Sequence, residues 1–203
     1  MCFEQALPAV LRPPHSGVVG ALPAPVAVHR LDNRVSGLVV VAKTRAAARF
    51  LSAEFRERRV EKRYRGIVVG RVAQPRQEVS VPLDGRDART TICVVDETPH
   101  VQAGWLTTVD LFPHTGRRHQ LRRHCAALGH GLLGDDLHAA PNQALHKRSG
   151  GLFLQSVEVR VRHPEVDGTW AHATIPEARK FERQRERALM GWEFEEQRRR
   201  ATG

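Results

Sequence analysis

The chain has 203 residues, with 32 Lys and Arg against 22 Asp and Glu and a formal net charge of +10. This length suits one domain that buries roughly 70% of its unfolded surface, so the core needs neither disulfides nor a metal. No apolar run approaches the ~20 residues of a membrane span, and the N-terminus lacks the pattern of a secretory leader. The charge favours a polyanion, first of all nucleic acid, over a membrane surface. Arg supplies 28 of the 32 basic residues, so part of this basicity can reflect the base composition of the gene.

The cysteines and histidines give no sign of a disulfide framework or a metal site. Cys2, Cys93 and Cys125 are odd in number and widely spaced, which predicts a reducing intracellular compartment, cytoplasmic or organellar. His119 and His124 are five residues apart, so they do not share one helical face, and no Cys-x-x-Cys pair accompanies them. We therefore expect no bound metal.

The first 70 residues predict two helices and three strands. The run from Gly37 to Lys43 is apolar almost throughout, which is typical of a strand buried on both faces. Thr44 is the expected N-cap of the helix that follows. The expected helices are Phe3 to Leu11 and Thr44 to about Arg58, the latter with Ala47, Phe50, Leu51 and Phe55 on its inner face, and the expected strands are Val26 to His29, Gly37 to Lys43 and Gly66 to Gly70.

The rest of the chain predicts hairpin-like strands with interposed helices. We expect a loop or hairpin edge over residues 74–90, antiparallel strands at Thr90 to Val95 and Trp105 to Phe112, a basic helix from Thr115 to Gly129, a polar loop over 138–150 and a strand from Gly151 to Arg162. Thr174 to Glu177 has the pattern of a capping box for a final helix, with Ala178, Phe181, Ala188, Leu189 and Trp192 on its inner face. This succession predicts an α+β fold with a mixed, mostly antiparallel sheet.

Asp32 stands out as a candidate functional residue. It follows His29-Arg30 and precedes a turn that opens into an apolar strand, so basic neighbours would favour its ionised form at the mouth of a cleft. Taken alone, these residues favour a simple turn that begins at Asp32 beside a solvated Arg30.

Three stretches in a fixed order decide between these interpretations. The first is His29-Arg30-Leu31-Asp32 with Ser36-Gly37, the second is Lys62-Arg63-Tyr64 closing on Gly70, and the third runs from Thr115-Gly116-Arg117-Arg118-His119-Gln120-Leu121-Arg122-Arg123-His124 to Gly134-Asp135. Together they resemble the motifs of the RluA family of RNA pseudouridine synthases, over most of the chain from Val26 to Pro176.

The resemblance implies a fold, a reaction and a partner. The expected fold is that of pseudouridine synthases, with helices flanking the sheet and a catalytic cleft across it. The expected reaction breaks the N1–C1′ bond of a uridine in RNA and rejoins the base through C5, without a metal or any other cofactor. The expected partner is rRNA or tRNA, in a ribosomal particle or free, bound by a protein that is monomeric on its own.

The resemblance also assigns three catalytic residues. Asp32 matches the catalytic aspartate, as nucleophile or as base. Arg122 matches the arginine that pairs with this aspartate and keeps it deprotonated. Tyr64 matches the aromatic residue that stacks on the uracil, and its hydroxyl could relay the C5 proton. Without the motifs, Tyr64 would be an ordinary strand-edge aromatic residue and Arg122 part of a solvated helix face.

Six further residues are assigned to substrate binding. Arg30 would fill the gap left by a flipped nucleotide, and Leu154 would form a wall of the base pocket. The remaining four would contact phosphates: Arg117, Arg118, His119 and Arg123.

The expected organisation has three parts. Residues 1–25 form an N-terminal extension, shortened relative to the family because no Lys-Pro-Ala-Gly segment precedes the first motif. Residues 26–180 form the catalytic domain, and residues 181–203 form a helix with a basic tail. A second functional hypothesis remains: an RNA-binding structural or ribosome-assembly factor that keeps the synthase fold without its chemistry.

Overall fold

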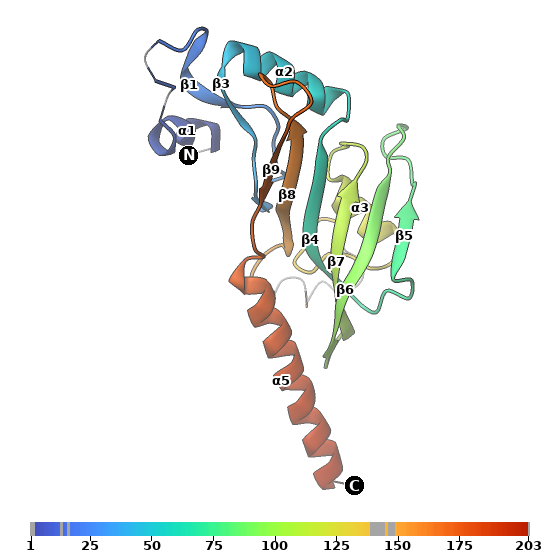
Figure 1. Ribbon diagram of the computed structural model, residues 1–203. Helices are drawn as coiled ribbons and strands as arrows, with labels where there is room; N and C mark the ends of the chain where they lie inside the picture. Colours follow the sequence, from blue (N-terminus) through green and yellow to red (C-terminus); the bar gives the residue numbers. More distant parts are fainter. Residues whose placement is uncertain (1–2, 13, 16, 139–144, 146–148, 203) are drawn as a thin grey trace.

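A mixed sheet of seven strands forms the centre of the molecule (Figure 1). The computed structural model describes residues 3–12, 14–15, 17–138, 145 and 149–202. In spatial order the strands are β2 (Ser36–Gly37), β8 (Leu154–Arg162), β4 (Glu61–Val69), β7 (Gly104–Pro113), β6 (Thr90–His100) and β5 (Arg76–Val79), while β9 (Trp170–Thr174) pairs with β8. Strand β2 is parallel to β8 and the other pairings are antiparallel, which confirms the expected fold class.

Four named helices and a small sheet surround this centre. The helices are α1 (Phe3–Val10), α2 (Arg45–Arg56), α3 (Gln120–Ala127) and α5 (Arg179–Thr202), and the small sheet consists of β1 (Ala21–Ala27) and β3 (Val41–Thr44). Figure 1 shows α1 and α2 with the small sheet at one end, while α5 extends beyond the main sheet at the other. Most of the expected polar loop over 138–150 lies outside the described residues.

The expected strand from Gly37 to Lys43 is wrong, because this stretch passes from one sheet to the other. Ser36 and Gly37 pair with β8 in the main sheet, and the chain joins β1 only at Val41. Gly37 has φ +116°, and a Cβ there would lie 2.1 Å from the carbonyl oxygen of Ser156. This close approach requires glycine and turns the chain away from the main sheet.

Helix α2 forms as the sequence predicts. The Thr44 hydroxyl accepts a hydrogen bond from the Ala47 N–H at 3.1 Å, which satisfies one of the free donors at the start of the helix. Of the expected inner face, Ala47 and Leu51 are buried, and Phe50 and Phe55 are partly buried against the same cluster.

The expected capping box before the last helix is also wrong. Thr174 is the last residue of β9, where it pairs with Glu158, and Ile175 N–H donates to Val157 O at 2.9 Å. Helix α5 therefore begins later, at Arg179. Within α5, Phe181 and Ala188 are buried while Leu189 is 42% exposed, because consecutive residues of a helix point in different directions.

Strand β4 separates two of the three apolar clusters of the described core. Val68 belongs to a cluster that includes Leu121 and Cys125 of α3, whereas Ile67 belongs to a cluster that includes Phe181 of α5. Side chains alternate between the two faces of a strand. Even-numbered residues of β4 therefore face the α3 side, and odd-numbered residues face the α5 side.

Candidate functional site

A cleft of about 1310 Å³ lies on the α3 side of β4. It is bordered by residues 28–35, the end of α2, β4, the start of β8 and residues 113–122. Two of its lining residues are acidic, Asp32 and Asp136. Its basic lining residues are Arg30, Arg34, Arg56, Arg58, Lys62, Arg117, Arg118 and Arg122. Such a charge balance suits a polyanionic ligand.

Asp32 is partly buried in a tight turn at one side of the cleft. Its carbonyl oxygen accepts a hydrogen bond from Val35 N–H at 3.0 Å, and Arg34 adopts a left-handed conformation with φ +74°. His29 anchors the turn, because its Nε2 accepts a hydrogen bond from Val40 N–H at 2.9 Å and its ring stacks on Phe55.

The His29 imidazole is neutral near pH 7. Burial lowers its pKa to about 4, and the charge of Lys62 acts in the same direction. Because Nε2 accepts a hydrogen bond, the ring proton sits on Nδ1. These properties give His29 a structural part in holding the turn rather than that of a proton donor.

Tyr64 lies on the cleft side of β4, close enough to Asp32 for the negative charge of Asp32 to affect the pKa of its hydroxyl. Burial raises the pKa of Tyr64 to about 12, and the charge of Asp32 also raises it. The phenol therefore keeps its proton at neutral pH and can act as a donor. Leu154, the first residue of β8, is buried and lines the same cleft.

Arg122 does not form the expected hydrogen-bonded pair with Asp32. Its guanidinium donates two hydrogen bonds to Asp135, from Nε at 2.9 Å and from Nη2 at 2.6 Å, and both side chains are buried. Asp135 raises the pKa of Arg122 most strongly, and the charges of Asp32 and Asp136 add to this. Arg122 thus acts on Asp32 electrostatically, while Asp135 fixes its position.

Asp135 is a residue of the site that had no role assigned to it in the sequence analysis. Burial raises its pKa, but hydrogen bonds from Arg122 and from the backbone N–H groups of His138 and Leu137 hold the pKa below its usual value. It follows Gly134, which has φ +80° and whose Cβ would lie 1.8 Å from the carbonyl oxygen of Gly151. The third motif contained both residues, but sequence spacing does not show which acid an arginine meets.

The approach to α3 is irregular where a helix was expected from Thr115. Gln120 Oε1 accepts hydrogen bonds from Thr115 Oγ1 at 2.6 Å and from Arg117 N–H at 3.0 Å, which holds this segment as a loop. His119 adopts φ +53° directly before the helix. One hydrogen bond of 2.8 Å joins its Nδ1 to Nε2 of His138.

Besides Leu154, five residues were expected to bind the substrate. Four of them line the cleft, and one does not. Arg30 and Arg118 are exposed at its rim, Arg117 is partly buried, and His119 lies beside them. Arg123 lies outside the cleft lining, where its guanidinium donates to both carboxylate oxygens of Asp84, at 2.9 and 3.0 Å. Arg123 thus lies on another side of α3 than Arg122, because consecutive residues of a helix point in different directions, and its contact with a phosphate stays a prediction.

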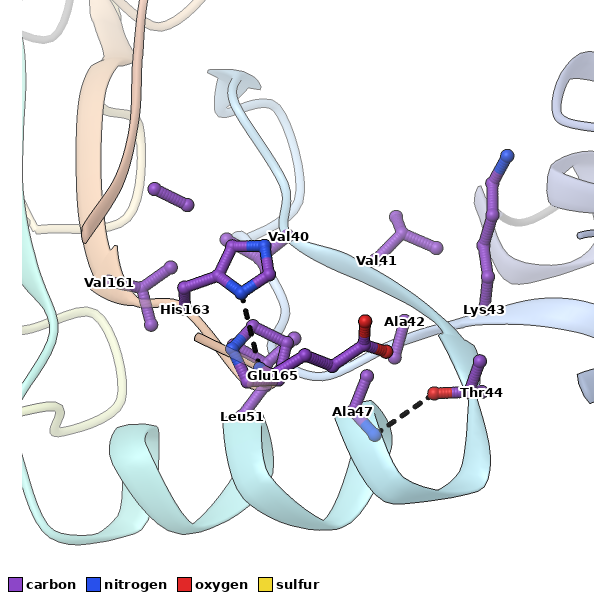
Figure 2. A pocket seen from close by; sticks show the side chains of 12 residues that line it. Val40, Val41, Ala42, Lys43, Thr44, Ala47, Leu51, Val161, His163 and Glu165 are labelled. Atoms are coloured by element: carbon purple, nitrogen blue, oxygen red, sulfur yellow. Dashed lines mark hydrogen bonds between the residues drawn. The ribbon is translucent and has the colours of Figure 1, made fainter. Parts of the chain in front are cut away.

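A second pocket, of about 310 Å³, lies between β3, α2 and the end of β8 (Figure 2). Its lining is largely apolar, with Lys43, His163 and Glu165 among the polar residues. His163 Nδ1 accepts a hydrogen bond from Glu165 N–H at 3.2 Å, and Figure 2 shows Lys43 extending away from both side chains. This pocket does not contain any of the nine residues assigned from the sequence.

Within the described ranges, no helix has both the length and the apolar character needed to cross a bilayer.

Comparison with known proteins places the chain among RNA-modifying enzymes. The family model described as RNA pseudouridylate synthase matches residues 21–127. The dual-specificity RNA pseudouridine synthase RluA of Yersinia pestis is 37% identical in an alignment of 166 residues that covers 74% of this chain and 77% of that protein. The ribosomal large subunit pseudouridine synthase D of Zymomonas mobilis is 33% identical in an alignment of 158 residues that covers 71% of this chain and 49% of that protein.

A solved structure leads to the same group. Human RNA pseudouridylate synthase domain containing 1 superposes with a TM-score of 0.67 at 27% sequence identity, over 76% of this chain and 70% of that chain. The relatives, the fold and the three motifs agree, so this chain belongs to the RluA family of RNA pseudouridine synthases, which are isomerases.

Proposed function

We propose that this protein isomerises specific uridines to pseudouridine in structured RNA, rRNA or tRNA, with Asp32 as the catalytic carboxylate. The observation that carries the proposal is the position of Asp32 beside Tyr64 in a cleft with eight basic and two acidic lining residues. A protein that only binds RNA gains nothing from a carboxylate that faces its phosphates. The names of the relatives, a dual-specificity RNA synthase and a ribosomal large subunit synthase, support RNA as the substrate and RNA of the large ribosomal subunit as one candidate.

The residues of the cleft can divide the reaction among them. Asp32 acts on the ribose or on the detached uracil, as nucleophile or as base, while the N1–C1′ bond breaks and the C5–C1′ bond forms. C5 loses a proton when it bonds to C1′, and N1 gains a proton after its bond to C1′ breaks. The product is therefore an isomer of the substrate. Tyr64 offers a flat face to the uracil and a protonated hydroxyl near Asp32 for proton transfer. Arg122, held by Asp135, stabilises the ionised carboxylate.

The test compares wild-type protein with the Asp32→Asn variant. We expect the substitution to reduce pseudouridine formation by at least about a thousandfold, with RNA affinity nearly unchanged because phosphate contacts carry the binding. Pseudouridine sites are mapped by carbodiimide-blocked primer extension across total RNA from cells that express either protein. A site present with the wild type and absent with the variant identifies the substrate.

Two results would reject the proposal. If no site changes while the protein still co-purifies with one RNA particle, the protein is an RNA-binding assembly factor. A large loss of RNA affinity in the Asp32→Asn variant would instead make Asp32 a residue needed for folding or binding.

A further inference from the structure

Lys62 is a positively charged residue of the cleft that no carboxylate among the described residues neutralises. It lies on β4, two residues before Tyr64, and lines the cleft with it. In the described part of the chain its ammonium has no carboxylate partner, and Nζ lies 6.0 Å from the centroid of the Phe55 ring. Three arginines close to it in the sequence are paired: Arg59 with Glu54 at 2.6 Å, Arg63 with Glu158 at 2.6 Å and Arg65 with Asp110 at 2.7 Å.

The surroundings of Lys62 make this charge costly in the free protein. Burial lowers the pKa of Lys62, and no acidic group offsets that effect. The neighbouring His29 is neutral, partly because of the positive charge of Lys62. A partly desolvated cation that lacks a partner destabilises the free state. A ligand that brings a negative charge to this position would relieve that cost.

We propose that Lys62 binds a backbone phosphate of the RNA strand, next to the nucleotide whose base contacts Tyr64. The inference rests on the proposed function and adds a binding residue to the same site. Residues two apart on one face of a strand are about 7 Å apart, which is comparable to the separation between a base and the phosphates on either side of its sugar. An ammonium group is a compact charge that binds phosphate oxygens from several directions.

The location of Lys62 separates this phosphate from those at the rim. Arg30 and Arg118 are exposed and can contact the RNA outside the cleft, whereas Lys62 is partly buried between β4 and the end of α2. A phosphate reaches Lys62 only when a nucleotide enters the cleft. Lys62 therefore favours the strand in its inserted position over RNA that is bound at the surface.

The test measures binding of an RNA stem-loop with an all-uridine loop to wild-type protein, Lys62→Met and Lys43→Met over a range of salt concentrations. Lys62→Met should weaken binding about tenfold and reduce the slope of log affinity against log salt by about 0.7, the value for one phosphate contact on a single strand. Lys43→Met is the matched control, because Lys43 is exposed beside the second pocket and faces no part of the cleft. An unchanged affinity and slope in Lys62→Met would overturn the proposal.

A second measurement uses wild-type protein and so does not depend on how a variant folds. Lysines carrying ¹³C-methyl groups report their pKa by NMR, and the signal of Lys62 is identified as the one that is missing from the spectrum of the Lys62→Met variant. Adding the stem-loop should raise the pKa of Lys62, and no change would contradict phosphate binding. Pseudouridine formation is measured separately: if wild-type protein forms none but Lys62 still responds to RNA, the synthase proposal fails and the binding role of Lys62 stands.

Discussion

The two faces of β4 use charged residues in opposite ways. On the α5 side, Arg63 and Arg65 share Asp110 and have further partners in Glu158 and Glu177. On the cleft side, the charge of Lys62 is not balanced by any described carboxylate. Neighbouring residues of one strand thus belong to a closed ion-pair network on one face and to an open, positive cleft on the other.

The charged residues on the α5 side of β4 stabilise the fold, whereas those on the cleft side are available to bind a ligand. The network on the α5 side joins β4, β7 and β8 to Glu177, which in turn pairs with Arg185 of α5. Removing one of its members should cost stability and leave the chemistry intact. Substitutions on the cleft side should change RNA binding or turnover, with the exception of the buried Arg122–Asp135 pair, which serves both purposes.

Asp135→Asn should have the largest effect on stability. The substitution leaves the buried Arg122 without its counter-charge, which costs about 3–5 kcal/mol, and it frees the guanidinium to move relative to Asp32. Urea denaturation measures the free energy of unfolding. The control is Asp136→Asn, whose 2.7 Å pair with Arg34 is exposed and should contribute less than about 1 kcal/mol. Equal losses in the two variants would contradict the structural part assigned to Asp135.

Tyr64→Phe should reduce turnover by about a hundredfold, the smaller end of the range for a general acid or base. The phenyl ring keeps the stacking surface, so RNA affinity and the free energy of unfolding should remain close to wild type. Single-turnover assays of pseudouridine formation, with a parallel binding measurement, separate the two contributions. A variant that binds RNA poorly but reacts at the normal rate would show that the hydroxyl takes no part in proton transfer.

Glu54→Gln removes a buried charge from helix α2. Its effect on the free energy of unfolding should depend on pH in a defined way. Hydrogen bonding to Arg162 lowers the pKa of the buried Glu54 to about 2, even though burial raises it. Its ordinary pKa is 4.5, so its contribution to stability is complete above about pH 4.5 and is lost as the pH falls towards 2.

The expected loss in Glu54→Gln is about 2 kcal/mol at neutral pH. Unfolding free energies of wild type and variant, measured between pH 6 and pH 2.5, should converge as the pH falls. Curves that remain parallel would show that Glu54 has the same pKa in the folded and unfolded states, and would contradict the lowering of its pKa by Arg162.

Asp110→Asn should have the smallest effect, about 1 kcal/mol. Arg63 and Arg65 each keep a second carboxylate, Glu158 and Glu177, and both arginines remain partly exposed to water. Thermal or urea unfolding measures the loss, and pseudouridine formation should not change. A decrease in turnover would break the separation between the two faces of β4.

The sequence predicted the features that depend on local pattern. The N-cap at Thr44 and the apolar face of α2 follow from helical periodicity, and the pairing of β6 with β7 follows from two alternating segments joined by a short connection. The three motifs likewise indicated the residues of the cleft, because their types and spacing carry the chemistry.

Only the tertiary structure decided which distant groups meet. It divided the run after Gly37 between two sheets, placed Thr174 in a strand, and gave Arg122 a buried partner in Asp135 while directing Arg123 to Asp84. A residue's helical or strand tendency depends on its neighbours in sequence, but its ion-pair partner depends on how elements pack. Local pattern therefore identified this family and its cleft, and packing alone determined which charges are balanced and which remain open to RNA.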